Sequence, residues 1–181
     1  MNKKILASAI LSVLSFGALA DTPSFDNLEI GFANMDFDGG IDLDGYEFKG
    51  SKMISDNLYI AGDYTDVSKN GFDASLTTFG IGYKNDFSNS SSFFTELDYA
   101  SFESDGGLDE DGYELTFGVR SMMTDQFEVK VALEYLEIDS EDTTSFVIGG
   151  AYDLGNDIAL YADYKYESDL SRYGVGLRYN F

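Results

Sequence analysis

The sequence predicts an all-β fold, a closed antiparallel transmembrane β-barrel of ten strands, and three observations support it. Apolar and polar residues alternate along short segments after residue 20, as in strands with one apolar and one polar face. The 19 Gly, one Pro and 28 Phe plus Tyr suit many short strands with tight turns and aromatic rims. No later stretch has the apolar length of a membrane helix, so only a barrel could cross a bilayer.

Residues 1–20 have the features of an export signal. Lys3 and Lys4 precede a largely apolar run, and Ala18-Leu19-Ala20 is a small-residue cleavage motif. The apolar run is short for a membrane anchor and contains several Ser. We therefore expect a cleaved signal peptide at 1–20 and a barrel domain at 21–181.

The first five predicted strands each place apolar residues at alternate positions and end at turn-forming residues such as Asn70-Gly71. Their outward faces are Leu28, Ile30 and Phe32 in 25–35; Tyr46 and Phe48 in 46–51; Leu58, Ile60 and Tyr64 in 58–65; Phe79, Ile81 and Tyr83 in 79–84; and Phe93, Leu97 and Tyr99 in 93–100.

The next four strands follow the same rule. Their outward faces are Tyr113, Leu115, Phe117 and Val119 in 113–120; Phe127 to Tyr135 at odd positions in 127–135; Phe146, Ile148 and Tyr152 in 146–152; and Ile158 to Tyr166 at even positions in 158–167. With a last strand at 172–181 the count is ten, an even number that brings both termini to one side. Eight strands remain the alternative if 79–84 and 146–152 are not strands.

The last strand has the clearest alternation, with a face of large apolar residues opposite a face of Arg, Gly and Asn. This face resembles the C-terminal strand of outer-membrane β-barrels, which ends on an aromatic residue. The resemblance implies that this apolar face is the signal recognised by the barrel-assembly machinery. The face consists of Tyr173, Val175, Leu177, Tyr179 and Phe181. The last strand of a soluble β-sandwich would also alternate.

Charged residues occupy the inward positions of nearly every predicted strand. The predicted lumen network is Glu47, Lys49, Asp63, Glu96, Asp98, Glu114, Arg120, Glu128, Lys130, Glu134, Asp163, Lys165, Arg172 and Arg178, with Glu29, Lys84 and Glu167 on the same face. The inside is thus nearly balanced, whereas residues 21–181 carry 9 − 33 = −24. The excess acid is expected in the connections, chiefly 36–44, 103–111 and 137–143. Either ion pairs fill a narrow barrel, or they line a small polar pore.

The chain contains no His. Known barrel enzymes, namely omptin proteases, outer-membrane phospholipases and lipid A acylases or deacylases, use a His as base or orienter. Glu96 and Asp98 are inward carboxylates two residues apart, which suits lumen charges better than acid–base catalysis. We expect no enzymatic activity and no cofactor.

An acidic motif occurs twice, at 38–48 and 105–115, each time as Asp-x-Asp-Gly before a predicted strand. Clustered carboxylates attract calcium or magnesium, so Asp42, Asp44, Asp109 and Asp111 are candidate ligands for weak binding at outer loops. The first Asp and the distal Glu of an EF-hand loop are missing from both copies. A solvated acidic loop with permissive glycines is the alternative explanation.

The runs Gly45–Ser51, Ile54–Tyr59 and Gly62–Tyr64, together with the strand pattern and Phe181, resemble small outer-membrane β-barrel proteins. The OmpX-like group is similar, and a ten-stranded barrel-domain subset known by the names quorum-factor or outer-membrane protein is most similar. The resemblance implies a Gram-negative outer-membrane location, and it implies almost nothing about activity.

We expect a non-enzymatic envelope protein that contributes to membrane integrity or surface contacts. A narrow, porin-like diffusion channel is the alternative. A soluble ligand-binding barrel would instead need an apolar interior. The expected partners are outer-membrane lipids, lipopolysaccharide and the assembly machinery. The acidic charge disfavours nucleic acid, and we expect a monomer.

Overall fold

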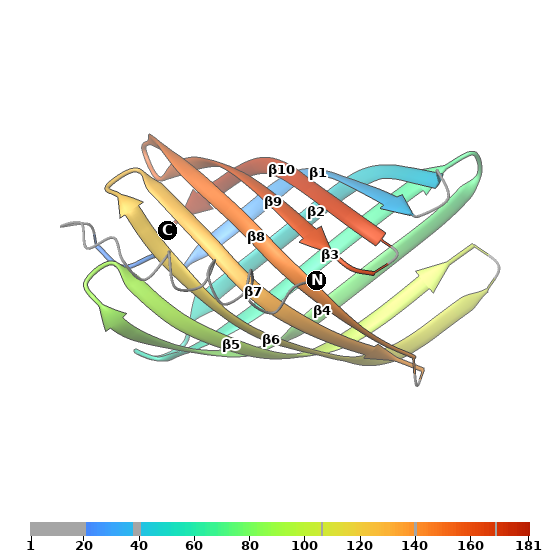
Figure 1. Ribbon diagram of the computed structural model, residues 1–181, viewed down its shortest axis with the longest axis horizontal. Coiled ribbons are helices and arrows are strands. Elements are labelled where there is room, and N and C mark those ends of the chain that lie inside the picture. Colours follow the sequence, from blue (N-terminus) through green and yellow to red (C-terminus); the bar gives the residue numbers. More distant parts are fainter. Residues whose placement is uncertain (1–20, 38–40, 106, 140, 169) are drawn as a thin grey trace.

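The computed structural model describes residues 21–37, 41–105, 107–139, 141–168 and 170–181, and these form a closed antiparallel barrel (Figure 1). The strands are β1 (Asn27–Phe37), β2 (Ile41–Met53), β3 (Leu58–Lys69), β4 (Phe72–Ser88), β5 (Ser91–Ser104), β6 (Leu108–Thr124), β7 (Phe127–Ile138), β8 (Glu141–Gly155), β9 (Ile158–Tyr166) and β10 (Leu170–Asn180). The predicted ten-stranded barrel is confirmed, and the eight-stranded alternative is wrong. The predicted signal peptide lies outside the described residues.

Each strand pairs with its neighbours in sequence, and β1 pairs with β10 to close the barrel. In Figure 1 the strands cross the view obliquely, with the C-terminus at the left. The end that carries Phe181 and the turns 54–57, 89–90, 125–126 and 156–157 is called the terminal end, and the opposite end the distal end. The predicted Asn70-Gly71 turn is present at the distal end, and both residues have positive φ (54° and 83°), as a tight hairpin requires.

No helix in the described part of the chain is long and apolar enough to cross a membrane.

The two faces of the barrel differ sharply in polarity. Most of the predicted outward residues are exposed or half-buried, including the exposed Phe32, Phe79 and Tyr99, while inward positions such as Glu47 and Thr65 are buried. Val131 on β7 is the exception among the outward residues, since it is buried. Exposed aromatics lie toward both ends, with Tyr46, Tyr64, Tyr99 and Tyr113 distal and Tyr83, Phe93, Phe127 and Tyr179 terminal. A polar interior inside an apolar wall is the arrangement of a membrane-spanning barrel.

The strands extend further than the sequence pattern predicted. The acidic segments expected to be loops at 36–44, 103–111 and 137–143 belong largely to paired strands, so Asp42 and Asp44 lie in β2 and Asp109 and Asp111 in β6. The turn expected at 153–157 likewise begins later, because β8 continues to Gly155. The alternation of apolar and polar residues disappears where both faces of a hairpin meet water. Backbone hydrogen bonding between the strands continues there, because it does not depend on that alternation.

Candidate functional site

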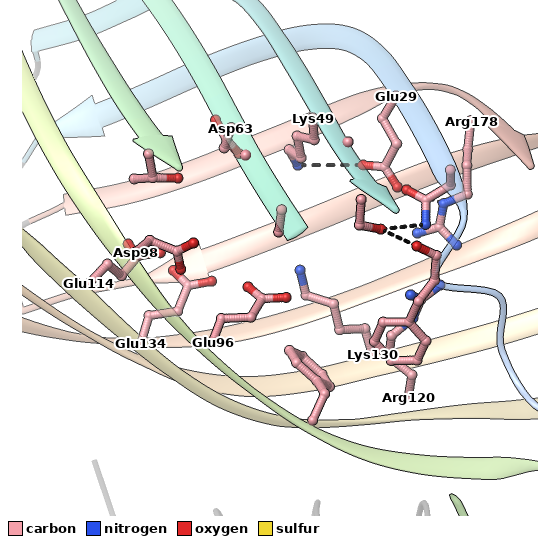
Figure 2. Close-up of a pocket in the computed structure, with 18 residues that line it drawn as sticks. Glu29, Lys49, Asp63, Glu96, Asp98, Glu114, Arg120, Lys130, Glu134 and Arg178 are labelled. Atoms are coloured by element: carbon pink, nitrogen blue, oxygen red, sulfur yellow. Dashed lines mark hydrogen bonds and ion pairs between the residues drawn. The ribbon is translucent and has the colours of Figure 1, made fainter. Parts of the chain in front are cut away.

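The barrel interior carries the candidate site, because charged residues from most strands converge there. The structure places all fourteen predicted lumen residues at inward positions, together with Glu29, Lys84 and Glu167. Figure 2 shows ten of these side chains around a cavity of about 130 Å³. A space of this size holds several water molecules.

An arginine–glutamate chain crosses the lumen near the terminal end. The Arg120 guanidinium donates two hydrogen bonds to the Glu128 carboxylate, at 2.8 and 2.9 Å. Arg178 donates to Glu128 at 3.1 Å and to Glu29 at 2.6 Å. All four side chains are buried, and the chain therefore links β1, β6, β7 and β10 across the barrel.

A second network surrounds Glu47, whose side chain is fully buried. The Tyr161 hydroxyl donates to its carboxylate at 2.8 Å, Lys49 Nζ lies 3.0 Å away and Arg172 3.3 Å away. Lys49 also contacts Asp163 at 2.7 Å. Glycine makes this packing possible, because a Cβ at residue 174 would lie 2.3 Å from Glu47 Oε1.

Lys165 is the centre of a third group, on the wall formed by β6 to β9. Its ammonium lies 2.8 Å from Glu134, 3.8 Å from Glu167 and 3.9 Å from Glu114. One lysine is therefore shared by three carboxylates, and Glu134 has the shortest contact.

The wall formed by β5 and β6 is acidic. Glu96 accepts a hydrogen bond from the Tyr59 hydroxyl at 2.6 Å, and Asp98 is directly opposite Glu114 in the strand register. In the described residues, neither Glu96 nor Asp98 has a Lys or Arg nitrogen within 4.0 Å. In Figure 2 these carboxylates lie together at one side of the cavity, and Arg120 and Arg178 lie at the other. The lumen therefore has an acidic side and a side where arginines are paired with carboxylates.

Sequence reasoning missed Phe25, which fills the terminal end of the lumen. The alternation predicts that Phe25 begins the first strand, but the residue precedes β1 and its ring is buried. The ring packs on Tyr59 and Phe94 with centroids 4.9 and 6.0 Å apart, and the Arg120 guanidinium lies 4.5 Å from its centroid. The alternation could have predicted this inward position, because Phe25 is an even number of residues from Glu29, which points inward.

The candidate cation ligands lie on the outward face near the distal end. Asp42 pairs with Lys69, Asp44 accepts a hydrogen bond from Asn34 Nδ2 at 2.9 Å, and Asp111 accepts one from Tyr99. The two repeats are on β2 and β6, with three strands between them. Within the described ranges no group of three acidic residues is arranged to hold a metal ion, so a cation response of this rim stays a prediction.

The predicted assembly residues lie on the outward face of β10. Tyr173, Val175, Leu177 and Tyr179 are each about half exposed. Phe181 follows the strand, stacks on Tyr179 with centroids 6.2 Å apart and lies 4.6 Å from the Lys52 ammonium. These residues place exposed apolar side chains along the outward face of β10, and their role in assembly stays a prediction.

Comparison with known proteins shows similarity of structure alone. No family model matches the sequence, and no curated protein matches it. The NanC porin has a TM-score of 0.58 at 9% identity, over 86% of this chain and 100% of that chain. OprG from Pseudomonas aeruginosa has a TM-score of 0.49 at 14% identity, over 91% and 99%. Ail from Yersinia pestis has a TM-score of 0.40 at 12% identity, over 86% of this chain and 97% of that chain.

The NanC comparison shows that this chain has the fold of an outer-membrane barrel. At 9% identity it is evidence for the fold only. The predicted likeness to small outer-membrane barrels is therefore supported by structure, and the site must be interpreted from its own residues.

Proposed function

We propose that this protein is an outer-membrane barrel that acts as a narrow diffusion channel for small polar solutes. The observation that carries the proposal is the charged cavity of about 130 Å³ in the lumen of a barrel with an apolar outer face. Ten strands give a barrel between the filled eight-stranded forms and the open porins. The fold shared with the NanC porin is consistent with this role.

The terminal end is assigned to the periplasm. It carries the C-terminus and the turns between even- and odd-numbered strands, and short turns face the periplasm in such barrels. The distal end then faces the cell exterior, and a solute would enter beside the acidic rim before it meets the lumen charges.

The described conformation is constricted at its periplasmic end. Phe25 fills the lumen there, and the chain from Glu29 to Arg120 crosses it. Ser51 Oγ donates to the Phe25 carbonyl at 2.8 Å, and Asp26 accepts a hydrogen bond from the Met53 amide at 2.7 Å. The plug is therefore tied to β2, and we expect a small unitary conductance.

Planar-bilayer recording of Phe25→Ala tests the proposal. Removing the ring opens the constriction, so unitary conductance should rise several-fold above the wild-type value. Phe32→Ala is the matched control, because this outward phenylalanine is 65% exposed and its loss should leave conductance unchanged. If neither the wild type nor Phe25→Ala produces current steps, the channel proposal is rejected.

A second candidate function is a structural envelope component that contacts lipopolysaccharide. It is favoured by a rim of outward carboxylates at the distal end that accept hydrogen bonds from neighbouring tyrosines. Tyr64 donates to Asp66 at 3.2 Å, and Tyr113 and Tyr135 donate to Glu137 at 2.8 and 2.9 Å. Divalent cations could bridge such a rim to lipid phosphates, and this role needs no open lumen.

A further inference from the structure

We propose that the acidic wall of the lumen, defined as Glu96, Asp98, Glu114 and Thr116, is a binding site for a small protonated primary amine. The site lies in the same lumen as the proposed channel, and its use in solute passage rests on that proposed function. Binding itself requires only the folded barrel.

The first observation is a local excess of negative charge. Glu96 and Asp98 have no ion-pair partner within 4.0 Å among the described residues. Glu114 has only Lys165, at 3.9 Å, and that lysine is 2.8 Å from Glu134. The other lumen carboxylates Glu29, Glu47 and Glu128 each contact an Arg or Lys. Lys130 lines the same cavity, but its ammonium has no described carboxylate within 4.0 Å. Glu96 and Asp98 therefore lack the close cation partner that the other lumen carboxylates have.

The second observation is the strand register. Asp98 on β5 is directly opposite Glu114 on β6, and both point inward. Side chains at such positions have Cβ atoms about 4.5–5.5 Å apart, and like charges placed there repel. Figure 2 shows both carboxylates beside those of Glu96 and Glu134 on one side of the cavity. A cation bound among them would turn this repulsion into attraction.

The third observation is that two buried side-chain oxygens of the wall, Asp98 Oδ1 and Thr116 Oγ1, have no hydrogen-bond partner within the described ranges. Glu47 Oε2 also has none, but it lies 3.3 Å from the Arg172 guanidinium. Asp98 is only 3% exposed and lines the cavity. Thr116 is opposite Glu96 in the register, one inward position from Glu114. Leaving a buried acceptor unpaired is costly, so Asp98 Oδ1, whose residue lines the cavity, points to a missing donor.

The chemistry favours an ammonium group as that donor. No group of three acidic residues in the described chain is arranged for direct metal coordination. Elsewhere in this lumen a lysine ammonium occupies equivalent positions, as Lys49 does at 2.7 Å from Asp163 and 3.0 Å from Glu47. A primary ammonium has three N–H donors, and a cavity of about 130 Å³ accepts a small amine with a few waters.

The test is equilibrium binding of methylammonium to the folded protein in a zwitterionic detergent. Tetramethylammonium is the matched cation, because it has the same charge and no N–H donor. At constant ionic strength, methylammonium should raise the melting temperature in a saturable way and should broaden its own ¹³C resonance, whereas tetramethylammonium should do neither.

Variants of the wall locate the site. Asp98→Asn and Glu114→Gln should each weaken binding about tenfold or more, the effect of losing one charge-assisted hydrogen bond. Both should fold, because each relieves the opposed charges, and folding is checked by heat-modifiable migration. Glu103→Gln is the control, since it removes an exposed carboxylate from the same strand and should leave binding unchanged.

Three outcomes would overturn the proposal: no saturable effect on the wild type, equal binding by Asp98→Asn and wild type, or an equal effect of sodium at the same ionic strength. The test is separate from conductance. If the barrel conducts but does not bind methylammonium, the channel proposal stands and the amine-site proposal is rejected. If the barrel binds methylammonium but does not conduct, the amine-site proposal stands and the channel proposal is rejected.

Discussion

Glu128 illustrates how single residues stabilise this barrel, because its one carboxylate pairs with both Arg120 and Arg178. All three side chains are buried. Glu128→Gln would leave the Arg120 guanidinium without its carboxylate and Arg178 with Glu29 alone, and removing one partner of a buried ion pair costs about 3–5 kcal/mol. We expect a loss of that size in the free energy of unfolding, measured by denaturant titration of the folded protein.

The control for this change is Glu141→Gln, at an exposed position at the start of β8. Exposed charges contribute little to stability, so its unfolding midpoint should stay near that of the wild type. Coinciding midpoints for the two variants would mean that the buried network does not stabilise the barrel.

At the scale of the element, β10 has two roles: it pairs with β1 to close the barrel, and it carries the predicted assembly signal. Phe181 stacks on Tyr179 and contacts Lys52. Phe181→Asp replaces the terminal ring by a charge, so we expect a lower yield of membrane-inserted, heat-modifiable protein. Phe181→Tyr keeps a ring and should assemble normally. Equal yields from Phe181→Asp and the wild type would show that assembly does not depend on this residue.

The elements were predictable where one face meets lipid and the other the lumen. Period-two alternation predicted all ten strands and their faces, as in 113–120, where Tyr113 is exposed and Thr116 buried. Strand ends were not predictable, because Asp42 and Asp109 extend paired hairpins into a region where no polarity contrast exists.

Within the candidate site, sequence predicted which residues are inward but not which of them pair. The inward positions of Asp98 and Glu114 followed from parity, whereas their opposition depends on the register between β5 and β6. The Phe25 plug depends on an irregular segment that folds back into the barrel, which strand periodicity does not describe.

At the scale of the whole molecule, the acidic rim predicts a response to divalent cations. Like charges around the distal rim repel within a Debye length of about 8 Å at physiological salt. Calcium should relieve this repulsion and raise the melting temperature by mass action, with a Kd of at best roughly 10⁻⁴ to 10⁻³ M, because the described residues contain no complete ligand set. The measurement is a melting series in detergent with calcium titrated at fixed ionic strength.

A variant with Asp42, Asp44, Asp109 and Asp111 changed to Asn is the comparison for this series. Its melting temperature should rise less with calcium than that of the wild type. An identical calcium shift in both proteins would show that these four residues are solvated surface, and sodium at matched ionic strength controls for general screening.

The seam between β1 and β10 has a consequence for how the chain folds. Nine of the ten strand pairings join neighbours in sequence, so their loop-closure entropy is small. The seam is different: it brings Arg178 to Glu29, 149 residues away. Hairpins can therefore form in order from the N-terminus, and β1 pairs with β2 along one edge. The other edge of β1 has no partner until the eleven residues of β10 are available. During that interval the growing sheet has two unpaired edges that invite aggregation, and closure is the expected rate-limiting event of folding.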